Sequence, residues 1–489
     1  MGIRNVVNRL FSLALILLLM QMFACDSGQQ GKIPITTSSK AAKEHFLKGR
    51  DMFEKLRAQE SLQHFENAVA ADTNFALAYL YLSFAQPTAK GFFEKLDKAV
   101  ALADRASEGE RLWILGNQAG VNAFPMQQRE YYQKMVAAYP NDERAHNFLG
   151  LNYFGQQEYD MAIQSFKKAT TINPEFSQPY NQMGYAYRFL ENYADAEKAF
   201  QKYIELIPGD PNPHDSYAEL LMKMGKYDAS IQSYRKALEL NPGFVASHLG
   251  IATNLNYKGQ HADAREQLEK LLEIARNDGE RRQACFATAV SFADEGNLDA
   301  AVEAIEKQYA LAENINDAAA MAGDRILIGN IMLEAEKPED AAQNYQNALE
   351  LILASGLAPE IKNNANRIFL YNSARVALAK NQLAEAKIAG DQFHAQVETI
   401  KNPNQLRLAH ELAGLIALAE KDYDQALEEL NQANQLNPFN IFRMALAYSG
   451  KGDTLNAKQM CEKAANFNAL NNLNQSFARL KANEMLKKL

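Results

Sequence analysis

Small and aromatic residues recur along the chain at a nearly constant offset, which points to a repeated structural unit. Gly150 has a counterpart 34 residues later in Gly184, and Phe166 has one in Phe200. Within each unit the apolar positions fall three or four residues apart, which is the spacing of an amphipathic helix. A proline closes the unit, as at Pro174. A self-similar period of this length indicates stacked helical units rather than one globular core.

The residue types inside one unit predict two antiparallel helices joined by a tight turn, as at residues 225–228. Gly150 and Ala162 would lie where the two helices cross, because a larger side chain there would force the helices apart. Phe166 would fill the space beside the crossing. Pro174 lacks an amide hydrogen and therefore ends the second helix. A single pair leaves apolar faces uncovered, so neighbouring pairs must stack.

The small residue at the helix crossing marks twelve units between residue 41 and the end of the chain. In the first half it recurs every 33 or 34 residues, and from residue 276 onward the spacing loosens to between 31 and 45 residues. The marker positions are Gly49, Ser83, Gly116, Gly150, Gly184, Ala218, Ala252, Ala289, Gly329, Ala374, Gly414 and Ala445.

This pattern resembles the tetratricopeptide repeat (TPR), which has small residues at its eighth and twentieth positions and an aromatic residue at its twenty-fourth. The resemblance implies an all-α fold, an α-solenoid that winds as a right-handed superhelix of about 12 TPR helix pairs. We expect a regular array over 41–275, a divergent array of longer period over 276–472, and a C-terminal capping helix over 473–489. In the capping helix, Leu473 and Phe477 lie at helical spacing on one apolar face.

Residues 1–24 have the character of a lipoprotein signal peptide. Basic residues precede an apolar run from Leu10 to Met20, which is short for a membrane span. Cys25 follows Ala24 directly, as in the lipobox of bacterial lipoproteins, and the resemblance makes Cys25 the expected site of lipid attachment. An ordinary signal peptide that contains a cysteine is the alternative. Residues 25–40 are rich in Gly, Ser, Thr and Gln, and predict a flexible tether.

Composition and motifs give no sign of catalysis or of nucleic-acid binding. The formal net charge is −8, whereas a nucleic-acid surface requires a basic stripe. The cysteines Cys25, Cys285 and Cys461 form no metal-binding motif, and the eight histidines never stand at ligand spacing. No nucleotide-binding, metalloprotease or serine-hydrolase motif is present. We therefore expect a protein that is not an enzyme and that uses no cofactor and no metal.

The TPR resemblance also implies a concave surface lined by the first helix of each pair. Amides such as Asn147 and Asn181 can bond the backbone of an extended peptide, and exposed aromatic side chains can form pockets between them. A solvated helix face without a ligand is the alternative. The lysine–asparagine clamp of cochaperone TPR domains is not matched, since Asn147 and Leu151 stand at its two positions. The expected peptide groove consists of Asn147, Phe154, Asn181, Tyr185, Arg188, Phe189, Asp215, Glu219 and Tyr257.

These features together predict a scaffold in the bacterial cell envelope, held to the membrane by its N-terminal lipid, that binds a peptide or protein partner. Asp26 is an inner-membrane retention signal in some Gram-negative bacteria only, so the choice of membrane stays open. Capture of glycans or nutrients at the outer membrane is the alternative. Lipoproteins of that kind use aromatic platforms, whereas Trp113 is the only tryptophan here. A spacer with no exposed groove aromatics is the third hypothesis.

Overall fold

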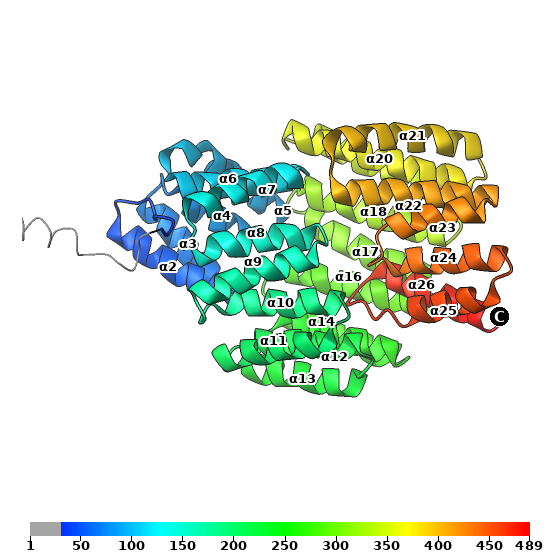
Figure 1. The fold of residues 1–489 in the computed structure, drawn as a ribbon, viewed down its shortest axis with the longest axis horizontal. Coiled ribbons are helices and arrows are strands. Elements are labelled where there is room, and N and C mark those ends of the chain that lie inside the picture. Colours follow the sequence, from blue (N-terminus) through cyan, green and yellow to red (C-terminus); the bar gives the residue numbers. More distant parts are fainter. Residues whose placement is uncertain (1–30) are drawn as a thin grey trace, which may run out of the picture.

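The computed structural model describes residues 31–489, in which the regular elements are α-helices and one short 3₁₀ helix. The expected signal peptide, residues 1–24, and the expected lipid-attachment site, Cys25, lie outside these residues. Among the helices that are described, none combines the length and the apolar character needed to cross a bilayer. Consecutive helices pack as hairpins and the hairpins stack in chain order, so the fold is an all-α solenoid, as predicted (Figure 1).

Twelve helix pairs follow one another, and we number them repeat 1 to repeat 12, with an even-numbered first helix in each. Repeats 1 to 4 are formed by α2 (Lys40–Glu54) and α3 (Ala58–Ala71), α4 (Ala76–Ala85) and α5 (Ala89–Ala101), α6 (Glu108–Val121) and α7 (Pro125–Ala138), and α8 (Glu143–Gly155) and α9 (Tyr159–Ile172). The 3₁₀ helix η1 (Ala103–Arg105) lies between repeats 2 and 3. Repeats 5 to 8 are formed by α10 (Ser177–Phe189) and α11 (Tyr193–Leu206), α12 (Pro211–Lys223) and α13 (Tyr227–Leu240), α14 (Val245–Tyr257) and α15 (His261–Ile274), and α16 (Asp278–Glu295) and α17 (Leu298–Glu313).

The second half of the array contains longer helices, which accounts for the longer sequence period there. Helices α8 to α15 have 13 or 14 residues each, whereas α16 to α22 have 16 to 21. Repeats 9 to 12 are formed by α18 (Ala318–Glu334) and α19 (Pro338–Ala354), α20 (Pro359–Ala379) and α21 (Leu383–Ile400), α22 (Pro403–Glu420) and α23 (Tyr423–Gln432), and α24 (Pro438–Gly450) and α25 (Thr454–Ala465). A single helix, α26 (Leu473–Leu486), follows them.

Each repeat is held together at the helix crossing that the sequence predicts. A Cβ atom added at Gly150 would lie 2.5 Å from the ring of Phe166, so only glycine lets α8 and α9 approach this closely. Phe166 is fully buried there. The predicted turn at residues 225–228 begins with Gly225 in the left-handed conformation, at φ 73°, which glycine adopts without strain.

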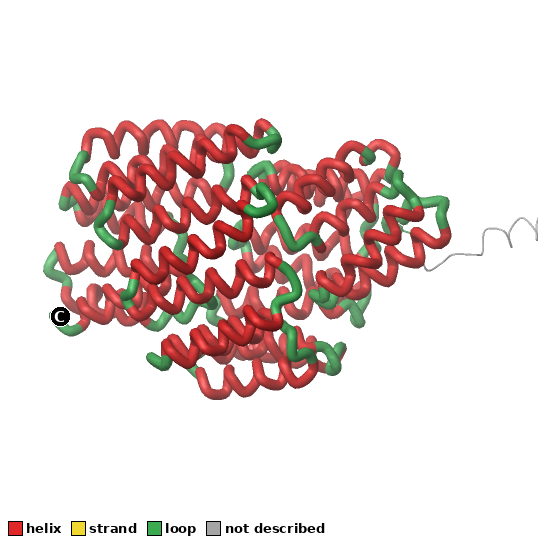
Figure 2. Tube along the Cα trace, turned by 180° about the vertical axis from the view of Figure 1, so that it is seen from behind, coloured by secondary structure: helices red, strands yellow, loops and turns green. Residues whose placement is uncertain are grey.

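The array winds far enough to contact itself, so that it forms two blocks rather than an open ribbon. We call repeats 1 to 8 the first turn and repeats 9 to 12 the second turn; in Figure 1 the second turn lies on the right, beside α16 and α17 of repeat 8. Lys90 N donates to Asp317 Oδ2 at 2.9 Å, and Asn402 Nδ2 donates to the carbonyl of Ala123 at 2.8 Å. In the view from behind, loops gather between the two blocks and at their outer ends (Figure 2).

Helix α26, which we expected to cap the array with one apolar and one polar face, lies between the two turns. It packs against α16 of the first turn and against α24 and α25 of the second. Ser476 is 2% exposed and donates to the carbonyl of Val290 at 3.2 Å. Asn474, Lys481 and Glu484 are exposed and form a polar face, while the rest of the helix meets repeats of both turns because the array curves back on itself.

The second part of the expected tether, residues 31–39, lies against the helices rather than extending away from them. Ile33 N donates to Asp142 Oδ2 at 2.9 Å, and Thr36 N donates to Glu110 Oε1 at 2.9 Å. Ile33 and Ile35 pack on the core of the first repeats. These two isoleucines bury apolar area that a Gly- and Ser-rich tether would lack, so the segment is bound to the body.

Candidate functional site

Seven of the nine predicted groove residues share one surface, where the first helices of repeats 4 to 7 meet. We call this surface the inner wall, and define it by Asn147, Asn181, Tyr185, Arg188, Asp215, Glu219 and Tyr257 on α8, α10, α12 and α14. Successive first helices contact one another along it, including α10 with α12 and α12 with α14. The first helices that carry these seven residues therefore lie side by side.

Most polar groups of the inner wall bond to a neighbouring repeat. Tyr185 Oη donates to Glu219 Oε1 at 2.8 Å, and Arg188 Nη1 lies 2.9 Å from Glu219 Oε2. Three further hydrogen bonds continue the pattern: Asn147 Nδ2 to Gln178 Oε1 at 2.9 Å, Ser216 Oγ to Tyr185 Oη at 3.2 Å, and Ser247 Oγ to Asp215 Oδ1 at 2.7 Å. The wall thus cross-links repeats through side chains that sequence reasoning assigned to a partner.

Burial changes the acid–base properties of this wall. Burial, followed by the charge of Glu219, raises the pKa of the Tyr185 hydroxyl well above its ordinary value. The same two causes raise the pKa of the Asp215 carboxyl well above its ordinary range, and the hydrogen bond from Ser247 opposes them. Two carboxyl groups therefore share a desolvated region that contains one arginine, Arg188, and this environment disfavours ionisation of Asp215.

Three amide and guanidinium atoms of the inner wall keep unused hydrogen-bonding capacity. Asn147 Oδ1, Asn181 Oδ1 and Arg188 Nε are buried and have no hydrogen-bond partner within residues 31–489. Buried polar atoms are normally paired, so each of these unpaired atoms costs stability of about 1–3 kcal/mol. They mark the part of the wall where a further polar group would be accommodated most favourably.

The predicted groove aromatics are half-buried, although we expected them to be exposed. Phe154 and Phe189 lie with their ring centroids 5.8 Å apart, and Tyr159 stacks on Phe189 at 5.2 Å. Leu436, from the loop between α23 and α24, packs on the same cluster. Because this loop belongs to the second turn, contact between the turns covers the apolar surface that the sequence left open.

Tyr257 is covered by the second turn in the same way. Its hydroxyl donates to the carbonyl of Ala469, in the loop between α25 and α26. The guanidinium of Arg479 lies 5.2 Å from the centre of the Tyr257 ring. Nearby, Lys223 Nζ donates to the carbonyl of Phe467 at 2.6 Å. The side chains at this end of the wall hold backbone carbonyls, which is the interaction expected for a bound peptide, but the peptide is the chain's own loop.

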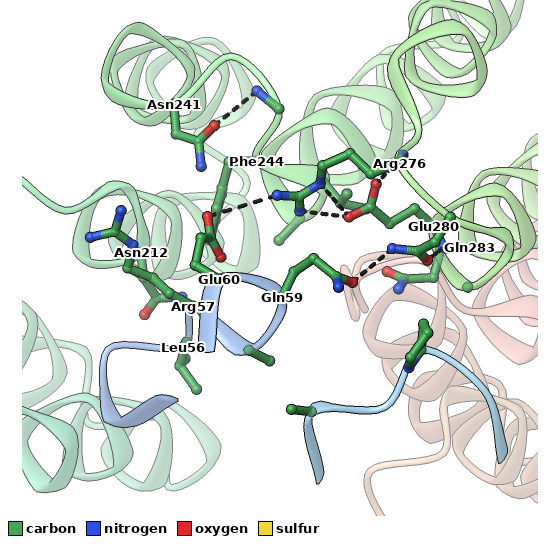
Figure 3. Close-up of a pocket in the computed structure, with 18 of the residues that line it drawn as sticks. Leu56, Arg57, Gln59, Glu60, Asn212, Asn241, Phe244, Arg276, Glu280 and Gln283 are labelled. Carbon is green, nitrogen blue, oxygen red and sulfur yellow. Dashed lines mark hydrogen bonds and ion pairs between the residues drawn. The ribbon is translucent and has the colours of Figure 1, made fainter. Parts of the chain in front are cut away.

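A cavity of about 410 Å³ lies where the first turn comes round to its own beginning. We call it the junction pocket. It is lined by Asn212 and by side chains from 56–60, 84–87, 241–246 and 276–283, which belong to repeats 1 and 2 and to repeats 6 to 8 (Figure 3). Its size is typical of pockets that bind a ligand or a protruding segment of a partner.

Paired charges and amides line the junction pocket. Arg276 lies between two carboxylates, 2.6 Å from Glu280 and 3.8 Å from Glu60 (Figure 3). Asn277 Nδ2 donates to Gln59 Oε1 at 2.7 Å and so joins repeat 8 to repeat 1. The side chain of Arg276 is 44% exposed, so its ion pairs are accessible to solvent and are weak. The exposed guanidinium of Arg276 can therefore exchange its contact with Glu60 for a contact with a partner at low cost.

Sequence reasoning missed the junction pocket because its walls come from segments about 200 residues apart. Gln59 and Asn277, for example, are separated by 218 positions. No local motif marks either residue. The only available signal was the repeat period, which predicts a superhelix but specifies neither how many repeats complete a turn nor how closely they approach.

The described residues contain no cluster of three or more potential metal ligands. The structure does bring together two histidines that are 19 residues apart in sequence, with His45 Nδ1 and His64 Nδ1 separated by 3.5 Å. Cys285 and Cys461 are free and buried, and burial raises the pKa of both thiols. A buried thiol with a raised pKa is a poor nucleophile, so neither cysteine has the properties of a catalytic residue.

Models of the tetratricopeptide repeat match residues 143–176, 177–210, 221–285 and 409–440. The first two segments coincide with repeats 4 and 5, in the register predicted from Gly150 and Gly184. The chain therefore contains tetratricopeptide repeats, and it stacks them as an all-α solenoid. None of the curated proteins compared with the chain matches it.

Several solved structures are similar to parts of this chain. MamA from Desulfovibrio magneticus RS-1, from its residue 41 to its end, is 16% identical, with 35% of this chain and 97% of that chain covered at a TM-score of 0.30. A tetratricopeptide repeat protein from Parabacteroides merdae ATCC 43184 is 16% identical, with 68% and 99% covered and a TM-score of 0.33. A monomeric mutant of IFIT1 with Gppp-AAAA is 14% identical, with 89% and 92% covered and a TM-score of 0.37.

Proposed function

We propose that this chain is a TPR scaffold, anchored in the bacterial cell envelope by a lipid on Cys25, that binds a protein or peptide partner. The recognised repeats support this proposal, because stacked helix pairs present extended surfaces for recognition. The observation that carries it is the junction pocket, a cavity of about 410 Å³ at which the polar side chains of Arg57, Arg276 and Gln283 are exposed. A polar loop or chain end of a partner would enter there.

The inner wall is a second proposed contact surface. Asn147 Oδ1 and Asn181 Oδ1 have unused capacity to accept hydrogen bonds, as required for binding a peptide backbone. Both residues are at most 1% exposed, so a peptide reaches them only when the packing over the wall opens. The junction pocket needs no such opening, which makes it the primary site in this proposal.

The alternative of glycan capture has less support. Sugar platforms need an exposed aromatic face, and tryptophan provides the largest one. Trp113, the only tryptophan, is 2% exposed and packs between Tyr81 and Phe148. Its ring therefore belongs to the core of the first repeats, and it offers no surface to a sugar.

Site-specific photocrosslinking in intact cells tests the partner proposal. A photoreactive residue at Gln283, which is exposed at the junction pocket, is compared with one at Glu205, which is exposed on α11 away from it. We expect a defined protein crosslink from position 283 that is absent at position 205. The same set of crosslinked proteins at both positions, or none at 283, would contradict the proposed site.

Mass spectrometry of the mature N-terminus tests the anchor. We expect the chain to begin at Cys25 with the mass of the attached acyl groups, and Cys25→Ser to release the protein from membranes. Recovery of an unmodified Cys25 from the envelope fraction would contradict this part of the proposal. The partner-binding part is judged separately, by crosslinking at Gln283.

A further inference from the structure

Residues 31–37, which we call the strap, run along one edge of the first turn. In chain order, the strap first crosses the loop between repeats 3 and 4, then the loop between repeats 2 and 3, and finally the loop between repeats 1 and 2. We call these loops, residues 72–75, 102–107 and 139–142, the strap edge. One hydrogen bond to each loop is Thr37 Oγ1 to Asp72 Oδ2 at 2.6 Å, Ser107 N to Thr36 Oγ1 at 3.0 Å, and Ile33 N to Asp142 Oδ2 at 2.9 Å.

The strap is inserted into the edge and not merely laid on it. A Cβ atom added at Gly109 would lie 2.9 Å from two carbons of Ile33, so the isoleucine occupies the space that the glycine leaves. Lys32 forms an ion pair with Glu143, whose side chain is only 4% exposed. Burial by itself would raise the pKa of Glu143, but the hydrogen bond from Lys32 and the charge of Arg144 hold it below its ordinary value. The contact therefore persists at neutral pH.

The chain can reach only a short distance beyond the strap. Gly31 lies against Asn141, with 3.2 Å between its added Cβ atom and Asn141 Nδ2. Five residues separate Gly31 from Cys25 in the sequence. Even fully extended, this length of chain spans only about 20 Å. An acyl group on Cys25 would therefore be confined close to the strap edge. A flexible tether as far as residue 40 would instead allow the folded body to take many orientations on the membrane.

We infer that the strap edge faces the lipid bilayer and that the second turn projects away from it. This orientation rests on the proposed lipid anchor at Cys25. The edge is polar, with Asn74, Asp104, Arg105 and Asn141 exposed, so it would face the lipid headgroups without entering the acyl region. The first repeats lie at one end of the long axis and the C-terminal repeats at the other (Figure 1). The junction pocket adjoins the turns within repeats 1 and 2, which lie at the opposite ends of those helices, about 20 Å of helix from the strap edge.

Energy transfer to labelled lipid tests this orientation. The lipidated protein is purified from membranes and reconstituted in vesicles of phosphatidylethanolamine and phosphatidylglycerol that contain an acceptor lipid. A donor dye is placed on a cysteine introduced at Asn141 or, as the matched control, at Lys451 in the turn between α24 and α25; both positions are exposed. Cys285 and Cys461 are buried and should not react. We expect transfer at least several-fold stronger from position 141, and equal or reversed transfer would overturn the inference.

Two further measurements separate the possible causes of failure. Protein that does not float with the vesicles would contradict the lipid anchor, and would overturn the orientation together with it. Protein that floats but transfers equally from both positions would contradict the orientation alone. Insertion of ten Gly and Ser residues after Asp26 leaves the strap intact, and we expect it to reduce the difference between the two positions. An unchanged difference would show that the body adheres to the bilayer by itself, which would overturn the role assigned to the strap.

Discussion

Arg188 on α10 lies 2.9 Å from the carboxylate of Glu219 on α12, across the contact between repeats 5 and 6. Tyr185 donates to the other oxygen of the same carboxylate at 2.8 Å. The Arg188 and Glu219 side chains are 12% and 13% exposed. Two residues that the TPR resemblance assigns to a partner are therefore paired with each other. Since the pair is shielded from solvent, loss of either partner would leave the other charge uncompensated at the contact between adjacent repeats.

Replacing Glu219 should destabilise the array strongly. Glu219→Gln leaves the guanidinium of Arg188 largely buried without a carboxylate, and the loss of one partner of a buried pair costs about 3–5 kcal/mol. We expect the midpoint of urea unfolding, followed by circular dichroism, to fall accordingly. Glu205→Gln is the matched control, because Glu205 pairs with Lys202 on the exposed face of α11 and should leave the midpoint nearly unchanged. Equal effects of the two substitutions would contradict the structural role of Glu219.

The helix crossing in repeat 4 should reject even one methyl group. Gly150→Ala places a Cβ atom 2.5 Å from the fully buried ring of Phe166, and the overpacking should cost about 1–3 kcal/mol despite the better helix propensity of alanine. Gly155→Ala, in the same helix, meets nothing within 4 Å and should be neutral or stabilising by up to about 1 kcal/mol. Thermal unfolding of the two variants distinguishes these outcomes. Stabilisation by both substitutions would show that the crossing is looser than the structure indicates.

Asp215 should make the stability of the array depend on pH. Burial and the nearby Glu219 raise the pKa of Asp215 in the folded state, so the folded chain binds this proton more tightly than the unfolded chain. The stabilisation is present at low pH and is lost as the pH rises through the raised pKa. Asp215→Asn keeps an oxygen that can accept the Ser247 hydrogen bond and removes the desolvated charge. We expect this variant to be more stable than the native chain at about pH 7, with the difference shrinking toward about pH 4.

The control for Asp215 is Asp160→Asn on the exposed face of α9. This substitution removes the same charge from a solvated position and should leave the slope of stability against pH nearly as it is in the native chain. Urea unfolding of all three proteins at several pH values makes the comparison. If the stability of the native chain rises over this pH range as much as that of the Asp215→Asn variant, the role assigned to Asp215 is wrong.

The contact between the turns should loosen when the hydroxyl of Tyr257 is removed. Tyr257→Phe leaves the carbonyl of Ala469 without this donor, which weakens the docking of the loop between α25 and α26 by about 1 kcal/mol. Hydrogen exchange measured by mass spectrometry should accelerate in residues 466–472, while exchange in α8 and α9 stays unchanged. Tyr448→Phe is the control, because the Tyr448 hydroxyl makes no hydrogen bond within the part of the chain that the structure describes. Equal exchange in both variants would contradict the role of Tyr257 in docking.

The sequence by itself determined the repeat and the fold class. The 34-residue offset that relates Gly150 to Gly184 identified the helix pairs, their crossings and their register, and the family models match the same segments. This was possible because each crossing joins residues that lie close in the chain: Gly150 and Phe166 are both within one repeat. Side-chain size at a few positions is sufficient to specify such a contact.

The tertiary structure alone decided which surfaces remain open. A small rotation between neighbouring repeats accumulates along the array, and its sum determines whether repeat 8 approaches repeat 1. Three features depend on this accumulated rotation or on contacts between distant segments. They are the junction pocket between Gln59 and Asn277, the loop over Tyr257 and the docking of the strap on Asp142. No single repeat encodes them. The sequence could place Tyr185, Arg188 and Glu219 on one wall, but only the assembled solenoid showed that they bond to one another.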